Sequence, residues 1–583
     1  YDASFKKWRF EHLPIVPEQW QLKPKAKTRK QLTVLKKLIK QANIIVHAGD
    51  PDREGQLLVD EVIEQVKLSQ AKKQQIQRLL ISDLNLSAVK KALNNLKSNR
   101  DFTPLSVSAL ARSRADWLFG MNLTRAYTLA GQKAGFGNVL SVGRVQTPIL
   151  GLVVNRDNEI ANFVAKPFYE VLAHLETEQQ QTFSAKWQPS KACEPYQDEE
   201  GRVLHRGLAE NVVSRITNQP AKVAELEQKQ KKQQAPLPYN LSALQIDAAK
   251  AFSMPAQKVL DTCQSLYERH KLITYPRSDN RYLPKEHHKD AAKIIAAIAN
   301  NEGQASEACK QADMSKRSKC FNDSKVAAHH AIVPTEKQLR SASLSSDEQK
   351  IYRLICRHYL IQFYPDYVFN ETKVTVEIAG GLFKAAAKQD VSLGFKALMG
   401  KTELKDVQTL PPLEKGQQLH CNQGDVVDKM TTPPAHFTDA TLLSAMTGIS
   451  RYVKDPEIKK ILKETDGLGT EATRAGILEL LFKRRFLERQ GKNILATATG
   501  KALISTLPEQ LASPDLTAKW EASLGNIAEQ HMSYQQFLTP LLAELHALVE
   551  QAKQCDSQVF AQLPKTPQKR RFKRKAKPRA KSA

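Results

Sequence analysis

The sequence predicts a multidomain protein that combines α/β and α+β folds. The chain has 583 residues, enough for several ordinary domains or for one large multi-lobed enzyme. Apolar runs alternate with helical patterns through the first hundred residues, which indicates a parallel sheet with crossover helices. Alternating segments at 167–187, 367–378 and 418–430 predict a β-rich part within a chain that is otherwise largely helical.

The first hundred residues carry a βαβα pattern. The run NIIVHAGD at 43–50 predicts a buried strand, and the periodic EGQLLVDEVIEQV behind it predicts a helix. QRLLIS at 77–82 is expected to form the next strand, and LSAVKKALNNL at 86–96 the next helix. In an open α/β sheet, ligands bind beyond the carboxyl ends of such strands.

The remaining chain has helical periodicity on both sides of the β-rich part. Helices are expected within 104–132, 241–272 and 438–550. The polar, proline-ended stretch EQKQKKQQAPLP at 227–238 is interpreted as a linker. The tail after about residue 556 is expected to be disordered.

Composition argues against several classes of protein. No apolar run approaches the roughly 18 residues of a membrane-spanning helix, and no signal-peptide pattern is found. The seven cysteines form no Cys-x-x-Cys pair, which argues against zinc ribbons and suits a reducing cytoplasm. GFKALMGKT at 394–402 has five residues between its glycines where a P-loop has four, so an ATP-driven motor is not expected.

The formal net charge is +26. The segment from Lys565 to the end contributes ten of these charges and contains no acid, which leaves the body of the chain at +16. A basic tail alone would be consistent with a solubility device. A body that is also basic favours a polyanionic partner, most simply nucleic acid, whose binding would weaken as salt rises.

The strongest local signal is HAGDPDREGQ at 47–56. Asp50, Asp52 and Glu54 follow the predicted strand at alternate positions, which in an extended chain places them on one face. Three neighbouring carboxylates repel one another unless a cation neutralises them, and an oxygen-rich set suits Mg²⁺. The alternative is an Asp-Pro turn in which Asp52 caps the next helix, which accounts for one acid of the three.

LITYPRSDNRY at 272–282 offers a nucleophile. Pro276 favours an extended backbone before it, so Tyr275 and Arg277 are expected on one face. A phenol with a pKa of about 10 attacks poorly unless a nearby cation stabilises the phenolate. Attack on a phosphodiester would give a phosphotyrosine that the released hydroxyl could reverse. From this segment alone, a half-buried tyrosine at a strand end is equally consistent.

Two segments before residue 151 could contact phosphates or bases. LSVGRVQTPIL at 140–150 could grip phosphates through Arg144 and its backbone amides. The helical stretch 108–132 carries arginines and Trp117, a combination that suits stacking with single-stranded bases. A basic, solvated helix face explains that stretch nearly as well, and KKWRF around Trp8 leaves the same choice open.

Two later segments are candidates as well. AAHHAIVPT at 327–335 carries His329 and His330, which face opposite ways in a strand, so at most one serves a given site. In GLGTEATRAGILELL at 467–481, a helix N-terminus with Arg474 suits a phosphate. Capping by Thr470 or Thr473 alone also explains that pattern.

Taken in order, DPDRE, SVGRVQTP, ITYPRSD, HHAIVPT and GTEATRA resemble the motifs of type IA DNA topoisomerases, and of the bacterial topoisomerase III branch in particular. The resemblance extends to about residue 550. It implies a four-domain toroid with a Toprim domain at its base. It also implies that the ring opens, passes a second strand through a protein-bridged break and reseals it without ATP, relaxing negative supercoils and decatenating DNA.

The resemblance also implies residue roles. Tyr275 would cleave one DNA strand and hold its 5′ phosphate, with Arg277 on the scissile phosphate and His329 supporting phosphate or proton transfer. Asp50, Asp52 and Glu54 match the Toprim acids that bind Mg²⁺. The DNA contacts implied are Trp8, Trp117, Arg125, Gln132, Ser141, Val142, Gly143, Arg144, Val145, Gln146, Arg277 and Arg474.

From the same resemblance we expect DNA with single-stranded regions as the partner, no membrane, a monomer, and a location in the bacterial cytoplasm at the nucleoid. Residues 449–465 resemble the basic insertion that favours decatenation. The expected domains are Toprim (1–103), helical gate (104–165 and 431–555), β-rich arch (166–236 and 334–430), lid with Tyr275 (237–333) and basic tail (556–583).

The chain also departs from the family pattern. The family begins with a strand that carries a Glu-Lys-Pro motif, which is not found before YDASFKK. We therefore expect this chain alone to be poorly active and its first domain to be destabilised. Two other functions stay open: a Toprim nuclease or primase-like enzyme that uses only the acids, and a non-catalytic protein that binds single-stranded DNA.

Overall fold

The computed structural model describes residues 3–81, 86–326, 329–339, 344–400, 409–453, 455–464 and 467–563. The chain divides into two compact units: unit 1 comprises Tyr1–Asp157 and His436–Ala583, and unit 2 comprises Asn158–Ala435. Within the described ranges, no helix is long and apolar enough to cross a membrane. The predicted disordered tail falls beyond the described residues, except for its first few, which include the short helix α20 (Gln558–Ala561).

The first part of unit 1 has a small sheet of order β1-β2-β3. The pair β1–β2 is parallel, as predicted, whereas β2–β3 is antiparallel. The elements are β1 (Val46–His47), α2 (Arg53–Glu64), β2 (Gln77–Arg78) and β3 (Lys97–Ser98), with α1 (Arg29–Gln41), α3 (Gln70–Gln74) and α4 (Leu86–Leu93). The two predicted strands and helices therefore form, although the strands are much shorter than the apolar runs that predicted them.

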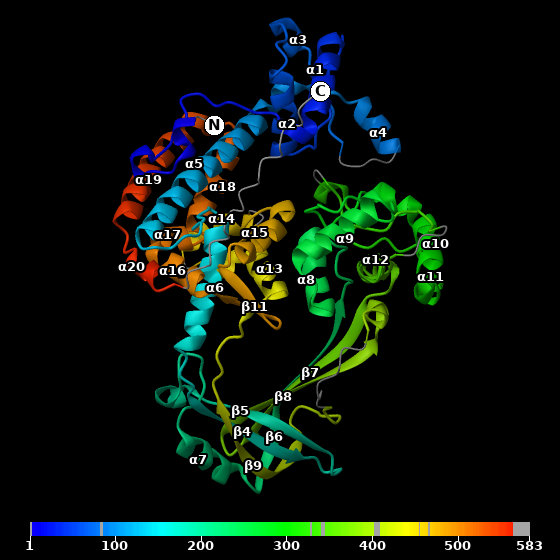
Figure 1. The fold of residues 1–583 in the computed structure, drawn as a ribbon. Coiled ribbons are helices and arrows are strands. Elements are labelled where there is room, and N and C mark those ends of the chain that lie inside the picture. The colour runs from blue at the N-terminus through cyan, green and yellow to red at the C-terminus, as the bar shows by residue number, and fades with distance from the viewer. Residues whose placement is uncertain are drawn as a thin grey trace, which may run out of the picture. The chain divides into compact units, whose positions relative to one another are not determined.

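The rest of unit 1 is mainly helical and is organised around α5 (Thr103–Lys133), which packs against α2, α18 and α19 (Figure 1). Pro104 lies in the first turn of α5, where its missing N–H has no helical partner to lose. The other helices are α6 (Gln146–Ala161, which ends in unit 2), α13 (Asp439–Thr447), α14 (Pro456–Glu464), α15 (Glu471–Lys483), α16 (Ala498–Thr506), α17 (Glu509–Ala512), α18 (Asp515–Ala528) and α19 (Tyr534–Gln554).

Sequence patterns missed one sheet in this helical part. β10 (Phe437–Thr438), β12 (Asn493–Ala496) and β11 (Leu487–Gln490) form a three-stranded antiparallel sheet inside the segment expected to be all helical. Strands of two to four residues are too short to show an alternating pattern against the helical periodicity on either side.

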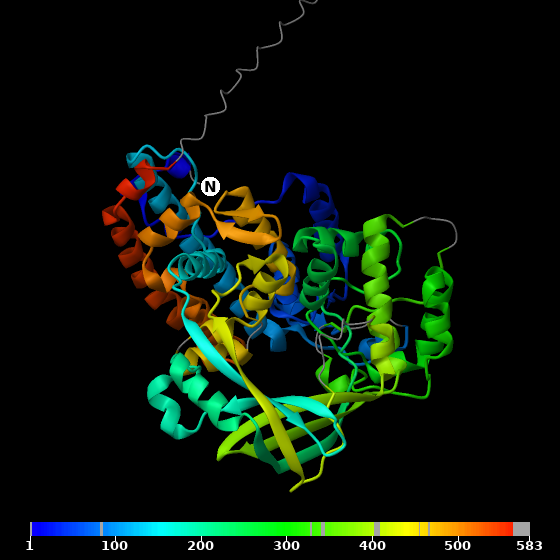
Figure 2. The ribbon, with the colours of Figure 1, turned by 90° about the horizontal axis from the view of Figure 1, so that it is seen from below.

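Unit 2 contains a closed barrel of order β4-β5-β8-β7-β6-β9. Its strands are β4 (Pro167–Glu176), β5 (Thr182–Gln188), β6 (Gln219–Gln233), β7 (Tyr367–Ile378), β8 (Gly381–Ser392) and β9 (Gln418–Met430). Apolar side chains such as Leu175, Val223 and Phe383 alternate into its core. The helix α7 (Arg206–Ile216) packs against β4 and β9, as Figures 1 and 2 show.

The interpretation of 227–238 as a linker was wrong, because residues up to Gln233 belong to β6. This end of β6 pairs with β7 along a ribbon that is exposed on both sides, so its side chains need no apolar alternation. Charged pairs between the two strands, such as Lys231 with Glu371 at 2.5 Å, take the place of an apolar face.

The remainder of unit 2 is a helical part that carries Tyr275. It contains α8 (Leu241–Phe252), α9 (Ala256–Glu268), α10 (Ala291–Asn301), α11 (Ser306–Lys310) and α12 (Ser346–Leu360). Between the helices, short β-bridges join Tyr239 to Ile332 and Ile273 to Pro334. These bridges bring the segments 272–275 and 331–335 together, which fixes the backbone just before Tyr275.

Candidate active site

The three predicted metal ligands lie on a turn between β1 and α2. Asp52 is the N-cap of α2, and its Oδ1 accepts a hydrogen bond of 2.6 Å from the Gly55 amide. Glu54 lies in the first turn of α2. The expectation that the three acids share one face of an extended chain was therefore wrong, because the chain turns into the helix at Asp52. The helix cap and a cluster of acids are both present.

The backbone of this turn is tightly enclosed. A Cβ added at Gly55 would come within 2.5 Å of the Asp50 carbonyl oxygen, and one added at Gly49 within 2.5 Å of the Gly55 carbonyl oxygen. Beneath the turn, the fully buried Arg78 donates five hydrogen bonds, to the carbonyls of His47, Gly49, Asp50 and Leu79 and to the Gln56 side chain. The positions of Asp50 and Asp52 are thus set by packing.

Two of the three acids, Asp50 and Asp52, lie close enough to share a hard cation. Carboxylate oxygens of Asp50 and Asp52 lie within 4.8 Å of one another, and Asp50 and Glu54 are exposed. Glu54 is held from the other side by Arg112, whose guanidinium lies 2.9 Å from Oε1. A partly exposed set of oxygen ligands of this kind suits Mg²⁺.

Behind Arg112 lies a buried charge cluster centred on Glu521 of α18. Arg144 donates to Glu521 at 3.0 Å and to Asp116 at 2.8 Å, and its side chain is only 2% exposed. Arg53 lies 3.3 Å from Glu521, and Arg112 lies 3.9 Å away. Burial favours a raised pKa for Glu521, but the three arginines outweigh it and hold that pKa below its ordinary value.

The burial of Arg144 limits which groups of the loop 141–146 could bind a phosphate. Its guanidinium is occupied by Asp116 and Glu521, so this structure does not present it to a phosphate. Two other polar atoms of the loop, Oγ of the buried Ser141 and Oε1 of Gln146, have no hydrogen-bond partner among the described residues. A buried polar atom without a partner is costly, and a ligand would satisfy it.

In unit 2, Tyr275 follows the short β-bridge of Ile273 and is 37% exposed. The Thr274 amide donates to the Val333 carbonyl, and the Thr274 hydroxyl donates to the Ala331 carbonyl, both at 3.0 Å. The side chain of Arg277 is exposed and forms no ion pair with any other described residue. The backbone of this segment is therefore fixed while Tyr275 and Arg277 face solvent.

His329 stacks on Tyr275, with ring centroids 5.2 Å apart. Its Nδ1 lies 3.5 Å from Oδ1 of Asp279, and hydrogen bonding to His329 lowers the pKa of Asp279. The neighbouring His330 packs against His287 instead. The prediction that only one of the adjacent histidines would serve a site with Tyr275 agrees with this arrangement.

Three of the implied DNA contacts, Trp117, Arg125 and Gln132, lie on α5. Arg125 lies over the Trp8 ring at 5.2 Å and donates to the Phe5 carbonyl. Trp117 is half-buried, and Gln132 is exposed in the last turn of the helix. By contrast, Arg474 is 1% exposed and donates to Glu471 and to the Leu468 carbonyl, so this structure does not present it to a phosphate.

Comparison with known proteins decides the family. The model of the DNA topoisomerase family matches residues 101–539, and that of the Toprim domain matches residues 11–84. DNA topoisomerase 3 of Vibrio cholerae is 56% identical over 98% of this chain and 90% of that protein. DNA topoisomerase 3 of Bacillus subtilis is 37% identical over 96% of this chain and 76% of that protein. The chain belongs to the type IA DNA topoisomerases.

A solved structure supports the fold of this topoisomerase. Topoisomerase I from Thermotoga maritima matches with a TM-score of 0.63 at 20% identity, over 90% of this chain and 81% of that one. The predicted fold class, mixed α/β and α+β with a Toprim domain, is confirmed. As a topoisomerase the protein is an isomerase that acts on DNA. The predicted ring arrangement of its domains stays a prediction.

Three residues that contact the predicted site residues escaped the sequence analysis. Asp279 lies inside a quoted motif, yet nothing in the motif identifies it as the partner of His329. Glu521 lies far along the chain from the three arginines that it holds, with no local pattern to mark it. Trp20 was also missed. It packs edge-on against Trp117 at 5.2 Å, and its closeness to Trp8 in the sequence was the only signal that it could belong to the same surface.

Proposed function

We propose that this topoisomerase cleaves single-stranded DNA through Tyr275, with Mg²⁺ as cofactor and without ATP. The observation that carries the proposal is the geometry around Tyr275: an exposed phenol stacked on His329, which is in turn in contact with Asp279. The stacking keeps a base beside the nucleophile and Asp279 beside the base, and a small rotation of the imidazole would bring its nitrogen to the phenol, as covalent catalysis needs.

In the proposed reaction, the Tyr275 hydroxyl oxygen attacks the phosphorus of a phosphodiester. The bond from phosphorus to the 3′ oxygen of the preceding nucleotide breaks, and that oxygen leaves as a 3′ hydroxyl. The 5′ phosphate stays on Tyr275 as a phosphotyrosine. His329 accepts or relays the phenolic proton, and Arg277 pairs with the phosphate charge. Religation is the reverse attack by the 3′ hydroxyl, and since one ester replaces another, no ATP is needed.

Asp50, Asp52 and Glu54 are the residues that would hold Mg²⁺. When bound, the metal supplies charge stabilisation for the phosphate and the leaving oxygen. The enclosed backbone around Gly55 and the hydrogen bonds from Arg78 hold the acids in place. Arg112 keeps Glu54 paired, which limits repulsion among the three carboxylates.

The DNA strand is proposed to follow α5 and the loop 141–146. Trp8, Trp117, Arg125 and Gln132 give stacking and hydrogen-bonding groups along the helix. Ser141 and Gln146, whose buried polar atoms lack described partners, would bond the strand where the loop meets it. The backbone of Val142, Gly143 and Val145 shares this loop, whereas Arg144 and Arg474 would need to leave their buried carboxylate partners first.

Decatenation is proposed to depend on the insertion at 449–465. Its described part contains α14, which buries Ile458 and Leu462 and exposes Lys459, Lys460 and Lys463. An exposed basic helix suits a second DNA segment. All the proposed groups come from one chain, so the reaction needs no second subunit, and we place it on DNA in the bacterial cytoplasm.

The proposal is tested by trapping the covalent adduct. The full chain is incubated with 5′-labelled or 3′-labelled single-stranded oligonucleotides, with and without Mg²⁺, and is then denatured. We expect a Mg²⁺-dependent adduct that forms through a 5′ phosphate and disappears in Tyr275→Phe. Tyr267→Phe is the matched control, because Tyr267 packs edge-on against Tyr275 at 5.8 Å and should leave the adduct intact.

Other outcomes would identify the alternatives. Cleavage that persists in Tyr275→Phe, with no label on protein, would indicate a Toprim nuclease. Binding of the oligonucleotide without any cleavage would indicate a single-stranded DNA-binding protein. Either result would refute the proposed phosphotyrosine mechanism for this chain.

A further inference from the structure

We propose that Trp20, Arg114 and Tyr534 form a stacking subsite that lengthens the single-stranded DNA track beyond Trp117. None of these three residues belongs to the implied DNA contacts. The inference rests on the proposed function, because it takes single-stranded DNA as the ligand.

The three side chains form one cluster with Trp117. Arg114 lies over the Trp20 ring at 5.1 Å and over the Tyr534 ring at 5.5 Å, and it donates to the Tyr534 hydroxyl at 3.2 Å. Trp20 packs edge-on against Trp117 at 5.2 Å. All four residues are half-buried, so each keeps part of its surface exposed.

Arg114 lies on the same face of α5 as the implied DNA contacts. Arg114 and Gln132 are separated by about five helical turns, as are Val107 and Arg125, so all four share one stripe of the helix. From Val107 to Gln132 this stripe is about 37 Å long at a rise of 1.5 Å per residue. Arg125 is only 7% exposed and lies against Trp8, so a strand along this stripe would contact Gln132 and Trp8 and then reach Trp117 and Arg114.

The N-terminal segment runs along α5 beside this stripe, in the opposite direction. Phe10 lies under Lys133 at 4.5 Å, Ile15 accepts from Asn122 at 3.0 Å, and Trp20 lies against Trp117 and Arg114. The segment thus adds an aromatic ring at each end of the stripe. A row of aromatic rings and cations along one line is typical of surfaces that stack successive bases.

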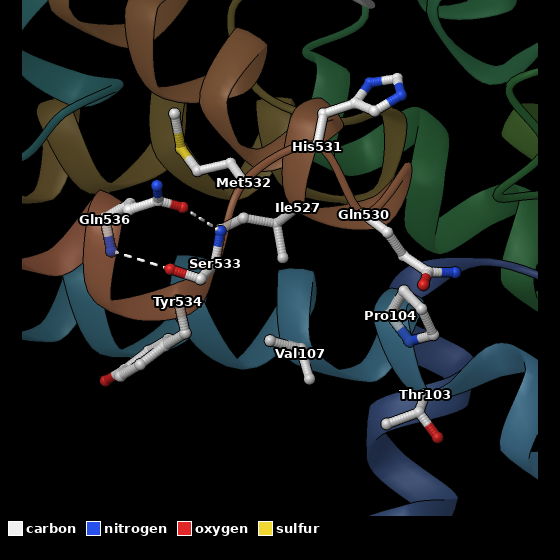
Figure 3. Close-up of a pocket in the computed structure, with 10 residues that line it drawn as sticks. All are labelled: Thr103, Pro104, Val107, Ile527, Gln530, His531, Met532, Ser533, Tyr534 and Gln536. Carbon is white, nitrogen blue, oxygen red and sulfur yellow. Dashed lines mark hydrogen bonds between the residues drawn. The ribbon is translucent and has the colours of Figure 1, made fainter.

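The stripe ends in an open cleft of about 490 Å³, shown in Figure 3. One wall is the first turns of α5 with Pro104 and Val107, and the other is the turn between α18 and α19. The Tyr534 ring lies beside Val107 at the edge of this cleft (Figure 3). A base that stacks on Tyr534 would have the apolar surface of Val107 nearby and the cleft as room for its sugar and phosphate.

Arg114 is suited to such a ligand. Its Nε is buried and has no hydrogen-bond partner among the described residues. In this cluster Arg114 donates a hydrogen bond to the neutral Tyr534 hydroxyl. Arg144 and Arg474, by contrast, are bound to carboxylates. A phosphate can therefore pair with Arg114 without displacing a bonded acid.

The test measures how DNA affinity depends on strand length. Fluorescent oligothymidylates of about 5, 8, 12 and 16 nucleotides span the usual site sizes of single-stranded binding surfaces. Their affinity for the full chain is measured by anisotropy without Mg²⁺. For Tyr534→Ala and Trp20→Leu we expect affinity for the longest strands to fall about tenfold, with little change for the shortest, which the Trp8 end of the stripe can hold alone.

Two controls separate contact from folding. Tyr196→Ala removes a more exposed tyrosine from unit 2 and should leave every affinity unchanged. Tyr534→Phe keeps the ring and should retain most of the affinity for long strands. Photocrosslinking with iodouracil-substituted strands should label peptides that contain Trp20 or Tyr534.

Three other outcomes would overturn the proposed subsite. Wild-type affinity for long strands that survives in both Tyr534→Ala and Trp20→Leu, without crosslinks to either peptide, would overturn the subsite and leave the proposed function standing. Equal losses for all strand lengths would show that the cluster only fastens the N-terminal segment to α5. A chain that binds no strand of any length would refute both the subsite and the proposed function.

Discussion

The carboxylate turn of unit 1 and the tyrosine segment of unit 2 are held in opposite ways. Around Asp50 and Asp52 the chain is enclosed: Gly49 and Gly55 leave no space for a Cβ, and Arg78 binds four carbonyls from below. Around Tyr275 the backbone is fixed through Thr274, while the phenol is 37% exposed and its ring packs against His329 and Tyr267.

The difference follows from what each region has to do. Metal ligands that repel one another need a rigid frame, because a small displacement changes the distances on which cation binding depends. A nucleophile that forms and breaks a bond to DNA must be reachable, so its ring cannot be packed on all sides. Substitutions in the enclosed turn should therefore have larger effects than substitutions around the tyrosine.

The largest effect is expected from a change in the charge cluster around Glu521, which lies beside the carboxylate turn. Glu521→Gln removes the carboxylate shared by Arg144, Arg53 and Arg112 and leaves Arg144 buried with Asp116 alone. Breaking a buried ion pair by removing one partner costs about 3–5 kcal/mol. We expect a loss of about 3 kcal/mol in the free energy of unfolding, measured by urea denaturation. Glu529→Gln, at an exposed pair with His531, is the control and should change little.

Gly55→Ala tests the rigidity of the turn directly. The new methyl group would meet the Asp50 carbonyl oxygen at 2.5 Å, so the backbone that carries Asp50 has to move. A misplacement of about 1 Å can cost on the order of 100-fold in rate, and we expect a loss of that size in Mg²⁺-dependent cleavage. The same exchange at Gly476 in α15, where a Cβ meets nothing within 4 Å, should leave cleavage unchanged. Equal activity of both variants would contradict an enclosed turn.

The sequence predicted most of the residues in this comparison, but not how they are buried. The motifs marked Tyr275, His329 and the three acids, because their residue types and order are local features. Helix α5 and strands β4, β7 and β9 were also expected, since each has a long and regular pattern. Local pattern could not show which arginines are buried. Arg144 owes its burial to Glu521, a partner 377 residues away.

A strand that is exposed on both faces is a second feature that the sequence pattern does not predict. One end of β6 is exposed on both faces, so its Lys, Glu and Gln residues look like a linker until β7 is placed beside it. Similarly, Asp52 was weighed either as a helix cap or as a metal ligand, and the structure has it as a cap beside Asp50. Sequence spacing does not specify where an extended chain turns into a helix.

Acidification should weaken unit 2, which carries the tyrosine. Burial, with Arg357 and Arg281 nearby, lowers the pKa of His358 to about 3, and its ring lies against Tyr239 near Asp247. Below pH 6.5 the unfolded chain binds a proton that the folded chain excludes, so stability falls as the pH falls from 6.5 towards 3. Between pH 6.5 and about pH 4.5 we expect a loss of about 2 kcal/mol, measured by thermal unfolding.

His358→Phe should flatten that part of the pH profile, because it removes the group that protonates on unfolding. The exposed His420 on β9 serves for comparison, and His420→Asn should keep the wild-type slope. If His358→Phe retained the full loss of stability, the acid sensitivity would have to come from another group. Protonation of His358 would then not be what destabilises unit 2 in acid.

The smallest effect is expected at Asp279, because it orients His329 from a half-exposed position. Its Oδ1 is 3.5 Å from His329 Nδ1, and an exposed pair of this kind is weakened by solvent. Asp279→Asn keeps the shape but loses the charge, so His329 should spend less time aligned with the phenol. We expect the single-turnover rate of adduct formation to fall about tenfold while the affinity for the oligonucleotide stays unchanged. The chain offers a matched aspartate on the barrel, where Asp425 lies 2.8 Å from His174 and is about as exposed as Asp279, and Asp425→Asn should leave the rate unchanged. A loss at Asp279 as large as that of Gly55→Ala would mean that the tyrosine segment depends on fixed geometry as strictly as the carboxylate turn, and the contrast between the two regions would fail.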